Sequence, residues 1–272
     1  MPIASIPNGK LYYETHGAGE PLLLHPGFGC TVEIYWRNTQ PLAEHFKVIV
    51  FDPRGTGRSD EGSPTMLMKD LADDAAALLD ELGIESAHVF GTSFGGMVAQ
   101  HIAMEHPERV RRLVLGCTTA GGAAHVLPAP ENMLKFIAAS EITDPTAALR
   151  STYFLNYSDE FVAKNDDLLV KRALANQHLR STAEGRAGQI HAVQNHDTQS
   201  RLGEITQPTL VAHGTEDGTV PVENGRVLAA GIPNSRLNLY PGGRHLFFTE
   251  HADALNRDIT SFLHGDGLSS AK

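Results

Sequence analysis

The segment from Val89 to Val98 contains the residues of this chain best suited to covalent chemistry. Within it, Ser93 lies between Gly91 and Gly95 in a Gly-x-Ser-x-Gly pattern. A β-prone run precedes the pattern and a run with helical periodicity follows it, which is typical of a sharp strand-to-helix turn that exposes a serine. Only glycine at the two flanking positions avoids a clash in such a turn. We therefore predict that Ser93 is a nucleophile.

A carboxylate and an imidazole suited to activate this serine follow later in the chain. Asp217 comes shortly after a buried strand predicted at 209–213, and His245 lies in a Gly-rich loop after a strand ending at Tyr240. An imidazole can take the proton of a serine hydroxyl, and a carboxylate can orient the imidazole. We predict Asp217 and His245 in these roles, with the neighbouring Glu216 left open as the acid on spacing alone.

Other polar residues fit these roles less well. The strand predicted to end at Leu115 is followed by Gly-Cys-Thr-Thr, which offers no carboxylate. Among fourteen histidines, His251 is the nearest rival to the predicted base, but it falls in the first turn of the last helix and is expected at the surface. His191 and His196 do not share one helix face and no further ligands accompany them, so we predict no metal site.

A second Gly-rich loop, 26–30, follows the apolar run 21–25 and reads Pro-Gly-Phe-Gly-Cys. Open α/β sheets place their ligand sites in loops at the carboxyl ends of strands. We predict that the backbone amides of Phe28 and Phe94 bind a developing oxyanion, with Gly27 as the alternative to Phe28. A third loop, 52–60, is given a structural role, in which Asp52, Arg54 and Asp60 pair with one another.

The elements that position these loops alternate between strands and helices. Apolar runs at 21–25, 46–51 and 87–90 are typical of strands buried on both faces of a parallel sheet, and 9–17 has the alternating pattern of an edge strand. A helix with one apolar face is predicted from Leu67 to Leu82. This order predicts an α/β fold with helices on both faces of a mostly parallel sheet.

The rhythm of strands and helices stops between residues 123 and 204. This stretch is predicted as an all-helical cap, or lid, inserted into a core of residues 1–122 and 205–272. The predicted cap helices are 131–140, 146–157, 159–176 and 182–194. Predicted substrate contacts are Phe28 in the core and Phe136, Tyr153 and Phe154 in the cap. The charged side chains of Arg150, Arg180 and Arg186 are expected on solvated helix faces.

Composition excludes several classes of partner. The chain has 272 residues, a formal charge of −10 and a pI near 5.7. Nucleic acids and anionic membranes attract basic surfaces, so we expect neither as a partner and favour a small, neutral or weakly polar substrate. The two cysteines suggest free thiols in a reducing compartment, and the first residues lack a signal-peptide pattern, so a cytoplasmic protein is expected.

The order Ser93, Asp217, His245, together with the turn at the serine, the Gly-rich loop and the helical insertion, resembles the α/β-hydrolase superfamily. It is most similar to single-cap bacterial hydrolases such as 3-oxoadipate enol-lactonases, small esterases and cofactor-free haloperoxidases. The resemblance implies an eight-stranded sheet with the cap over Ser93. The usual His-Gly before the oxyanion residue is here His25-Pro26-Gly27. Family members that process halides and epoxides have aspartate in place of Ser93, which disfavours those activities.

The resemblance implies a serine hydrolase that cleaves an ester or lactone of a small molecule through an acyl-enzyme, without a cofactor. Activity is then expected to rise with pH as His245 loses its proton. Two alternatives remain, a ligand sensor with slow turnover and a hydrolase of carbon–carbon bonds. The sequence does not indicate the oligomeric state.

Overall fold

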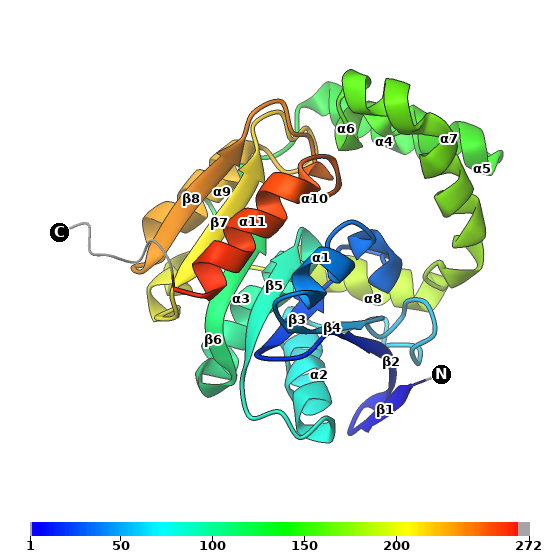
Figure 1. Ribbon diagram of the computed structural model, residues 1–272. Coiled ribbons are helices and arrows are strands. Elements are labelled where there is room, and N and C mark those ends of the chain that lie inside the picture. Colours follow the sequence, from blue (N-terminus) through cyan, green and yellow to red (C-terminus); the bar gives the residue numbers. More distant parts are fainter. Residues whose placement is uncertain (1, 266–272) are drawn as a thin grey trace.

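The computed structural model describes residues 2–265 of the chain, which form a mixed eight-stranded sheet (Figure 1). The strand order is β1-β2-β4-β3-β5-β6-β7-β8. The strands are β1 (Ile3–Ile6), β2 (Gly9–His16), β3 (Pro21–His25), β4 (Lys47–Phe51), β5 (Ala87–Thr92), β6 (Val110–Gly116), β7 (Thr209–Gly214) and β8 (Ser235–Tyr240). Strands β3 to β8 are parallel to one another, and β2 is antiparallel to both β1 and β4. The predicted α/β-hydrolase fold with a mostly parallel, eight-stranded sheet is confirmed. The strand predicted at 9–17 forms as β2, but the prediction that it lies at the edge of the sheet is wrong, because β1 pairs with β2 and is the edge strand.

Helices cover both faces of the sheet, because neighbouring residues of each buried strand point to opposite sides. In β3, Leu23 packs into a core with helices α2 (Met68–Glu81) and α3 (Phe94–Glu105). Leu22 and Leu24 pack on the other face, with α11 (Ala252–Leu263). The remaining core helices are η1 (Val32–Tyr35), α1 (Thr39–Ala43), η2 (Pro107–Arg109), α9 (Val222–Gly231) and α10 (Phe247–Glu250).

The predicted helical segment lies between β6 and β7. It contains α4 (Pro130–Ser140), α5 (Pro145–Ser151), α6 (Tyr153–Asn156), α7 (Asp159–Ala175), η3 (Gln177–Leu179), α8 (Ala183–Gln194) and η4 (Gln199–Glu204). The predicted single helix at 146–157 is wrong, because α5 ends at Ser151 and the chain becomes helical again in α6 after Thr152. Figure 1 shows α4 to α7 as an arch, whereas α8 lies closer to the sheet. We refer to α4–α7, residues 130–175, as the arch. Within residues 2–265, no helix is long and apolar enough to cross a membrane.

The loop 52–60 is tied to its surroundings by contacts other than the predicted ones. Asp52 forms an ion pair with Arg58 at 2.8 Å, and Arg54 forms one with Asp74 of α2 at 2.5 Å. Asp60 accepts a hydrogen bond from the amide of Lys10. The predicted pairing among Asp52, Arg54 and Asp60 is therefore wrong, because each side chain reaches a different partner.

Candidate active site

Ser93 lies at a strained turn between β5 and α3. Its backbone has φ 54° and ψ −119°, a combination that costs a non-glycine residue about 1–3 kcal/mol. A β-carbon at Gly91 would lie 2.1 Å from the carbonyl oxygen of Gly95, and one at Gly95 would lie 2.1 Å from that of His25. Both glycines are therefore required by close backbone contacts. The turn ends the strand abruptly and presents the Ser93 hydroxyl at the carboxyl edge of the sheet.

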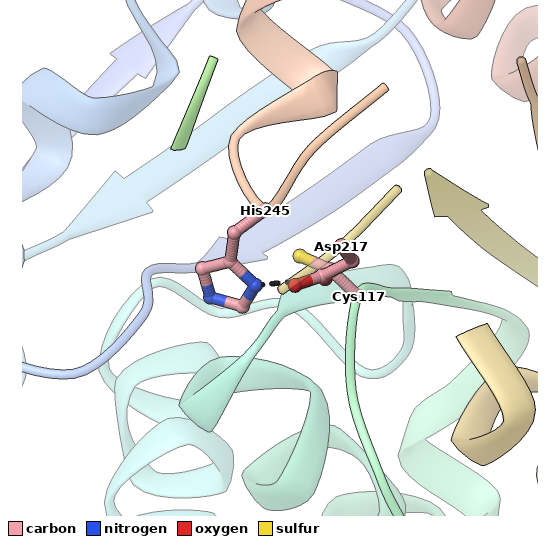
Figure 2. A group of neighbouring side chains, drawn as sticks. All are labelled: Cys117, Asp217 and His245. Atoms are coloured by element: carbon pink, nitrogen blue, oxygen red, sulfur yellow. Dashed lines mark hydrogen bonds and ion pairs between the residues drawn. The ribbon is translucent and has the colours of Figure 1, made fainter. Parts of the chain in front are cut away.

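The structure brings His245 and Asp217 to this serine from two other strand ends. Figure 2 shows the pairing of His245 with Asp217. His245 Nε2 lies 3.1 Å from Ser93 Oγ, and His245 Nδ1 lies 2.8 Å from Asp217 Oδ2. The backbone amide of His245 donates to the carbonyl of Leu155 in α6 at 3.0 Å. The imidazole is thus held between its acid and its serine by a loop that is itself anchored to the arch.

Asp217 is buried at 6% exposure and is held in the ionised form. Its Oδ1 accepts hydrogen bonds from the amides of Thr219 and Val220 at 2.9 and 2.8 Å. Burial raises the pKa of Asp217, but the charge of His245 and contacts with the imidazoles of His213 and His245 outweigh it, so the pKa falls to about 2. An ionised carboxylate only accepts hydrogen bonds, so His245 Nδ1 carries the proton. In this tautomer, the lone pair of the uncharged imidazole at Nε2 is the one that faces Ser93.

The alternatives left open by spacing are resolved by exposure and distance. Glu216 is exposed, so the acid beside His245 is Asp217. His251 packs its ring against Tyr240, with ring centroids 5.9 Å apart, rather than near Ser93. The sequence did not predict that His213 lies beside Asp217. His213 is fully buried, and its Nε2 lies 2.8 Å from the carbonyl oxygen of Val220 and 3.5 Å from Asp217 Oδ2. The only signal in the sequence was a polar residue near the end of an apolar strand.

The Gly-rich loop 26–30 folds against the serine turn. Gly27 lies beside Ser93, with 3.6 Å between its ideal β-carbon position and Ser93 Cβ, and the rings of Phe28 and Phe94 are 6.1 Å apart. The amide of Phe94 opens α3, where no carbonyl of the same helix is in reach. In the part of the chain that the structure describes, neither Gly27 nor Phe28 uses its amide in a hydrogen bond. These amides fit the predicted oxyanion site, with the choice between Gly27 and Phe28 unchanged.

A cavity of about 520 Å³, here called the serine cavity, opens above Ser93. Its wall includes Phe28 and Met97 from the core and Phe136, Ile190 and Val193 from the helical segment. A smaller cavity of about 240 Å³ shares Cys30, Ile34 and Leu246 with it and is lined also by Arg172 and Arg180.

Two of the predicted substrate contacts do not line the serine cavity. Tyr153 is buried with Tyr157 and Phe161, and its hydroxyl donates to Asp166 at 3.0 Å. The ring of Phe154 faces the ammonium of Lys135 at 5.0 Å. The prediction that these two rings line the cavity is wrong, because both rings pack elsewhere and α6 lines the cavity with Leu155 and Asn156 instead. Phe28 and Phe136 do line it.

Cys117 adds a thiol to the site (Figure 2). Its sulfur and the ligand atoms of Asp217 and His245 lie within 4.8 Å of one another, a set chemically able to hold a metal ion. Burial raises the pKa of the Cys117 thiol well above its usual value, which keeps it protonated. A metal ion held there would also occupy the Nδ1 that His245 uses to reach Asp217. Cys30 and Cys117 are both free thiols, as predicted.

The mostly parallel sheet, the strained serine turn and the Ser93–His245–Asp217 geometry are those of an α/β hydrolase. Residues 20–252 match the family described as alpha/beta hydrolase fold, so the chain belongs to this family and is a hydrolase of that fold.

Named relatives span nearly all of the chain. A putative carbamate hydrolase RutD from Azorhizobium caulinodans is 32% identical over 96% of this chain and 98% of its own. A 2-hydroxy-6-oxononadienedioate/2-hydroxy-6-oxononatrienedioate hydrolase from Cupriavidus pinatubonensis is 34% identical over 84% of this chain and 80% of its own. Among solved structures, Est816, titled an N-acyl homoserine lactone degrading enzyme, is 26% identical, covers 96% of this chain and 100% of its own, and superposes with a TM-score of 0.78.

Proposed function

We propose that the protein hydrolyses a carboxylic ester or lactone of a small, mainly apolar molecule, with Ser93, His245 and Asp217 as its catalytic triad. The observation that carries this proposal is the 3.1 Å approach of His245 Nε2 to the Ser93 hydroxyl at the floor of the serine cavity. This is the distance at which an imidazole can take the serine proton.

The reaction follows from these positions. Ser93 Oγ attacks the substrate carbonyl carbon while His245 takes the hydroxyl proton, and Asp217 stabilises the resulting imidazolium. The amides of Phe28 and Phe94 bind the oxyanion, each such donor contributing about 3 kcal/mol. Collapse of the tetrahedral intermediate expels the alcohol, which takes the proton from His245. Water, deprotonated by His245, then attacks the acyl-enzyme and releases the acid and Ser93.

The lining of the serine cavity supports an uncharged substrate. Within the described chain, none of its lining residues is Lys, Arg, Asp or Glu. A charged group buried there has no partner, and an unpaired buried charge is costly. The apolar wall instead favours an acyl chain, at roughly 25 cal/mol for each Å² of apolar surface removed from water. The similarity to a structure titled as a lactone-degrading enzyme agrees with this choice.

Hydrolysis of carbon–carbon bonds is the second candidate, because the relative from Cupriavidus pinatubonensis carries that substrate type in its name. A nonadienedioate has two carboxylates. Arg172 and Arg180 line the adjoining smaller cavity, but the serine cavity offers no such cation within the described residues. A dioate therefore fits this site less well than a neutral ester. The similarity to a putative carbamate hydrolase adds carbamates, whose carbonyl the same attack would open.

A substrate panel tests this proposal. It contains p-nitrophenyl esters of graded acyl length, neutral lactones, an aryl carbamate and a dienedioate, each assayed with wild type and Ser93→Ala. We expect multiple turnovers on neutral esters or lactones, and a loss of about 10³-fold or more in Ser93→Ala. Turnover of the dienedioate alone would overturn the substrate class. A single slow turnover on every substrate would favour the ligand sensor.

A further inference from the structure

Gln189 is a polar side chain buried in the middle of α8, with 0% exposure. Its Oε1 accepts a hydrogen bond from the backbone amide of Gly29 at 2.8 Å. Its Nε2 donates to the hydroxyl of Thr56 at 2.8 Å. One side chain thus joins three segments that are distant in sequence: the helical insertion, the loop 26–30 and the loop 52–60. Buried polar groups are stabilising only when paired in this way.

Helix α8 lies close enough for this bridge because its inner face is made of small residues. Gly185, Gly188, Gln189 and Ala192 are the buried residues of the helix and follow one another at helical spacing. A β-carbon at Gly185 would lie 2.2 Å from the carbonyl oxygen of Gly55, and one at Gly188 would lie 2.3 Å from that of Ser63. Backbone contacts of this kind hold the helix at a fixed distance from the core.

The bond to Gly29 bears directly on the predicted oxyanion donors. Gly29 adopts a left-handed conformation, φ 64°, and directly follows Phe28. The carbonyl of Gly27 accepts from the amide of Cys30 at 3.1 Å, which closes the loop into a turn. Within this turn, holding the Gly29 amide also fixes the peptide planes on either side of Phe28. The amide of Phe28 then does not have to be reoriented when the oxyanion forms.

We propose that Gln189 is a positioning residue for the oxyanion site, an inference that rests on the proposed function. It touches neither the nucleophile nor the substrate carbonyl, and it acts by aiming the amides of loop 26–30. An error of about 1 Å in such an aim costs about 100-fold in rate. Helix α8 therefore helps to hold the oxyanion site in place, although it belongs to the helical insertion.

The test compares Gln189→Met, which keeps the length but removes both hydrogen bonds, with Gln189→Glu, which keeps an acceptor for the Gly29 amide. Gln177→Met is the matched control, since Gln177 is an exposed residue of η3. The measurements are kcat and KM on the preferred ester, and the affinity for an alkyl boronic acid, which forms a tetrahedral adduct on serine. A non-reacting ketone analogue of the ester reports ground-state binding.

For Gln189→Met we expect kcat to fall by about 10- to 100-fold, with KM and ketone affinity within about twofold of wild type. Boronate affinity is expected to fall in parallel with kcat, and Gln189→Glu to recover most of both. Wild-type kcat and boronate affinity in Gln189→Met, or equal losses for ketone and boronate, would overturn the inference.

Two further measurements keep the test decisive. If Gln189→Met does not fold, Thr56→Val replaces it, since this change removes the acceptor that orients the Gln189 amide and leaves Gly29 in place. A loss of kcat and boronate affinity is then expected with ketone affinity kept, and unchanged values for all three refute the role of Gln189. Failure of the proposed function itself is recognised separately, because wild type and Gln177→Met would then both fail to turn over esters and to bind the boronate.

Discussion

Helices α8 and α4 belong to the same insertion and both line the serine cavity, yet they differ in how closely they contact the core. The backbone of helix α8 is in close contact with the backbone of the core loops, and the side chains of Gln189 and Ala192 are 0% exposed. Helix α8 also exposes Ile190 and Val193 beside the serine cavity, at 42% and 37%, but the apolar side chains of α4 are more exposed, with Leu134 at 67% and Phe136 at 55%. We infer that small displacements of α8 change the rate, because α8 holds loop 26–30 through Gln189, whereas α4 only lines the serine cavity and changes which substrates bind.

The largest effect is expected where α8 meets the core. Gly185→Ala places a β-carbon 2.2 Å from the carbonyl oxygen of Gly55, so the helix has to move outwards and takes Gln189 with it. We expect kcat to fall by about 100-fold and the free energy of unfolding by about 1–3 kcal/mol, measured by ester hydrolysis and urea titration. Gly203→Ala is the control, because nothing lies within 4 Å of a β-carbon at Gly203. Equal results for the two variants would show that the close contact of α8 is unimportant.

A smaller effect is expected from the difference between the buried charge of Asp217 and the exposed charges of the arch. Asp217 has a pKa of about 2, below the 3.8 of a free side chain, so its stabilising contribution is present above pH 4 and is lost as the pH falls through 2. The shift corresponds to about 2 kcal/mol. Urea unfolding between pH 7 and pH 2 is expected to show this loss in wild type and a shallower one in Asp217→Asn.

Glu160 provides the matched comparison from the arch. Its hydrogen bond to Lys164 lowers its pKa, but both side chains are exposed, at 80% and 68%. Exposed pairs at this spacing contribute little to stability. Glu160→Gln is therefore expected to follow the wild-type curve of stability against pH. If the stability of Glu160→Gln depended on pH as weakly as that of Asp217→Asn, the distinction between the buried active-site charge and the exposed charges of the arch would be contradicted.

The smallest effect is expected in α4. Phe136 lines the serine cavity, so Phe136→Ala should raise KM for an octanoyl ester about fivefold, by removing apolar contact worth about 1 kcal/mol, and leave acetyl ester hydrolysis unchanged. Leu134→Ala, two residues away and not in the lining, should change neither. Equal changes for both acyl lengths would place Phe136 outside the acyl site.

Sequence reasoning succeeded where the structure is local and failed where it depends on distant contacts. Five consecutive residues determine the turn at Ser93, because close backbone contacts within and beside the turn require glycine at two of these positions. Asp217 and His245 could also be predicted, because they follow strands whose carboxyl ends share one edge of the sheet. Helical periodicity showed that residues near Tyr153 and Gln189 have an inward side, but it carries no information about what that side meets. Tyr153 was therefore assigned to the cavity wrongly, and the contact of Gln189 with Gly29 was not foreseen.

The most direct test of the central claim is covalent labelling with a serine-directed alkyl phosphonate, followed by intact-mass measurement and peptide mapping. We predict one adduct for each chain, located on Ser93, with hydrolytic activity lost in proportion to labelling. Ser93→Ala should keep its fold, take up no label and hydrolyse no ester. An adduct on another residue, or ester hydrolysis by Ser93→Ala at the wild-type rate, would contradict the assignment of Ser93 as the nucleophile.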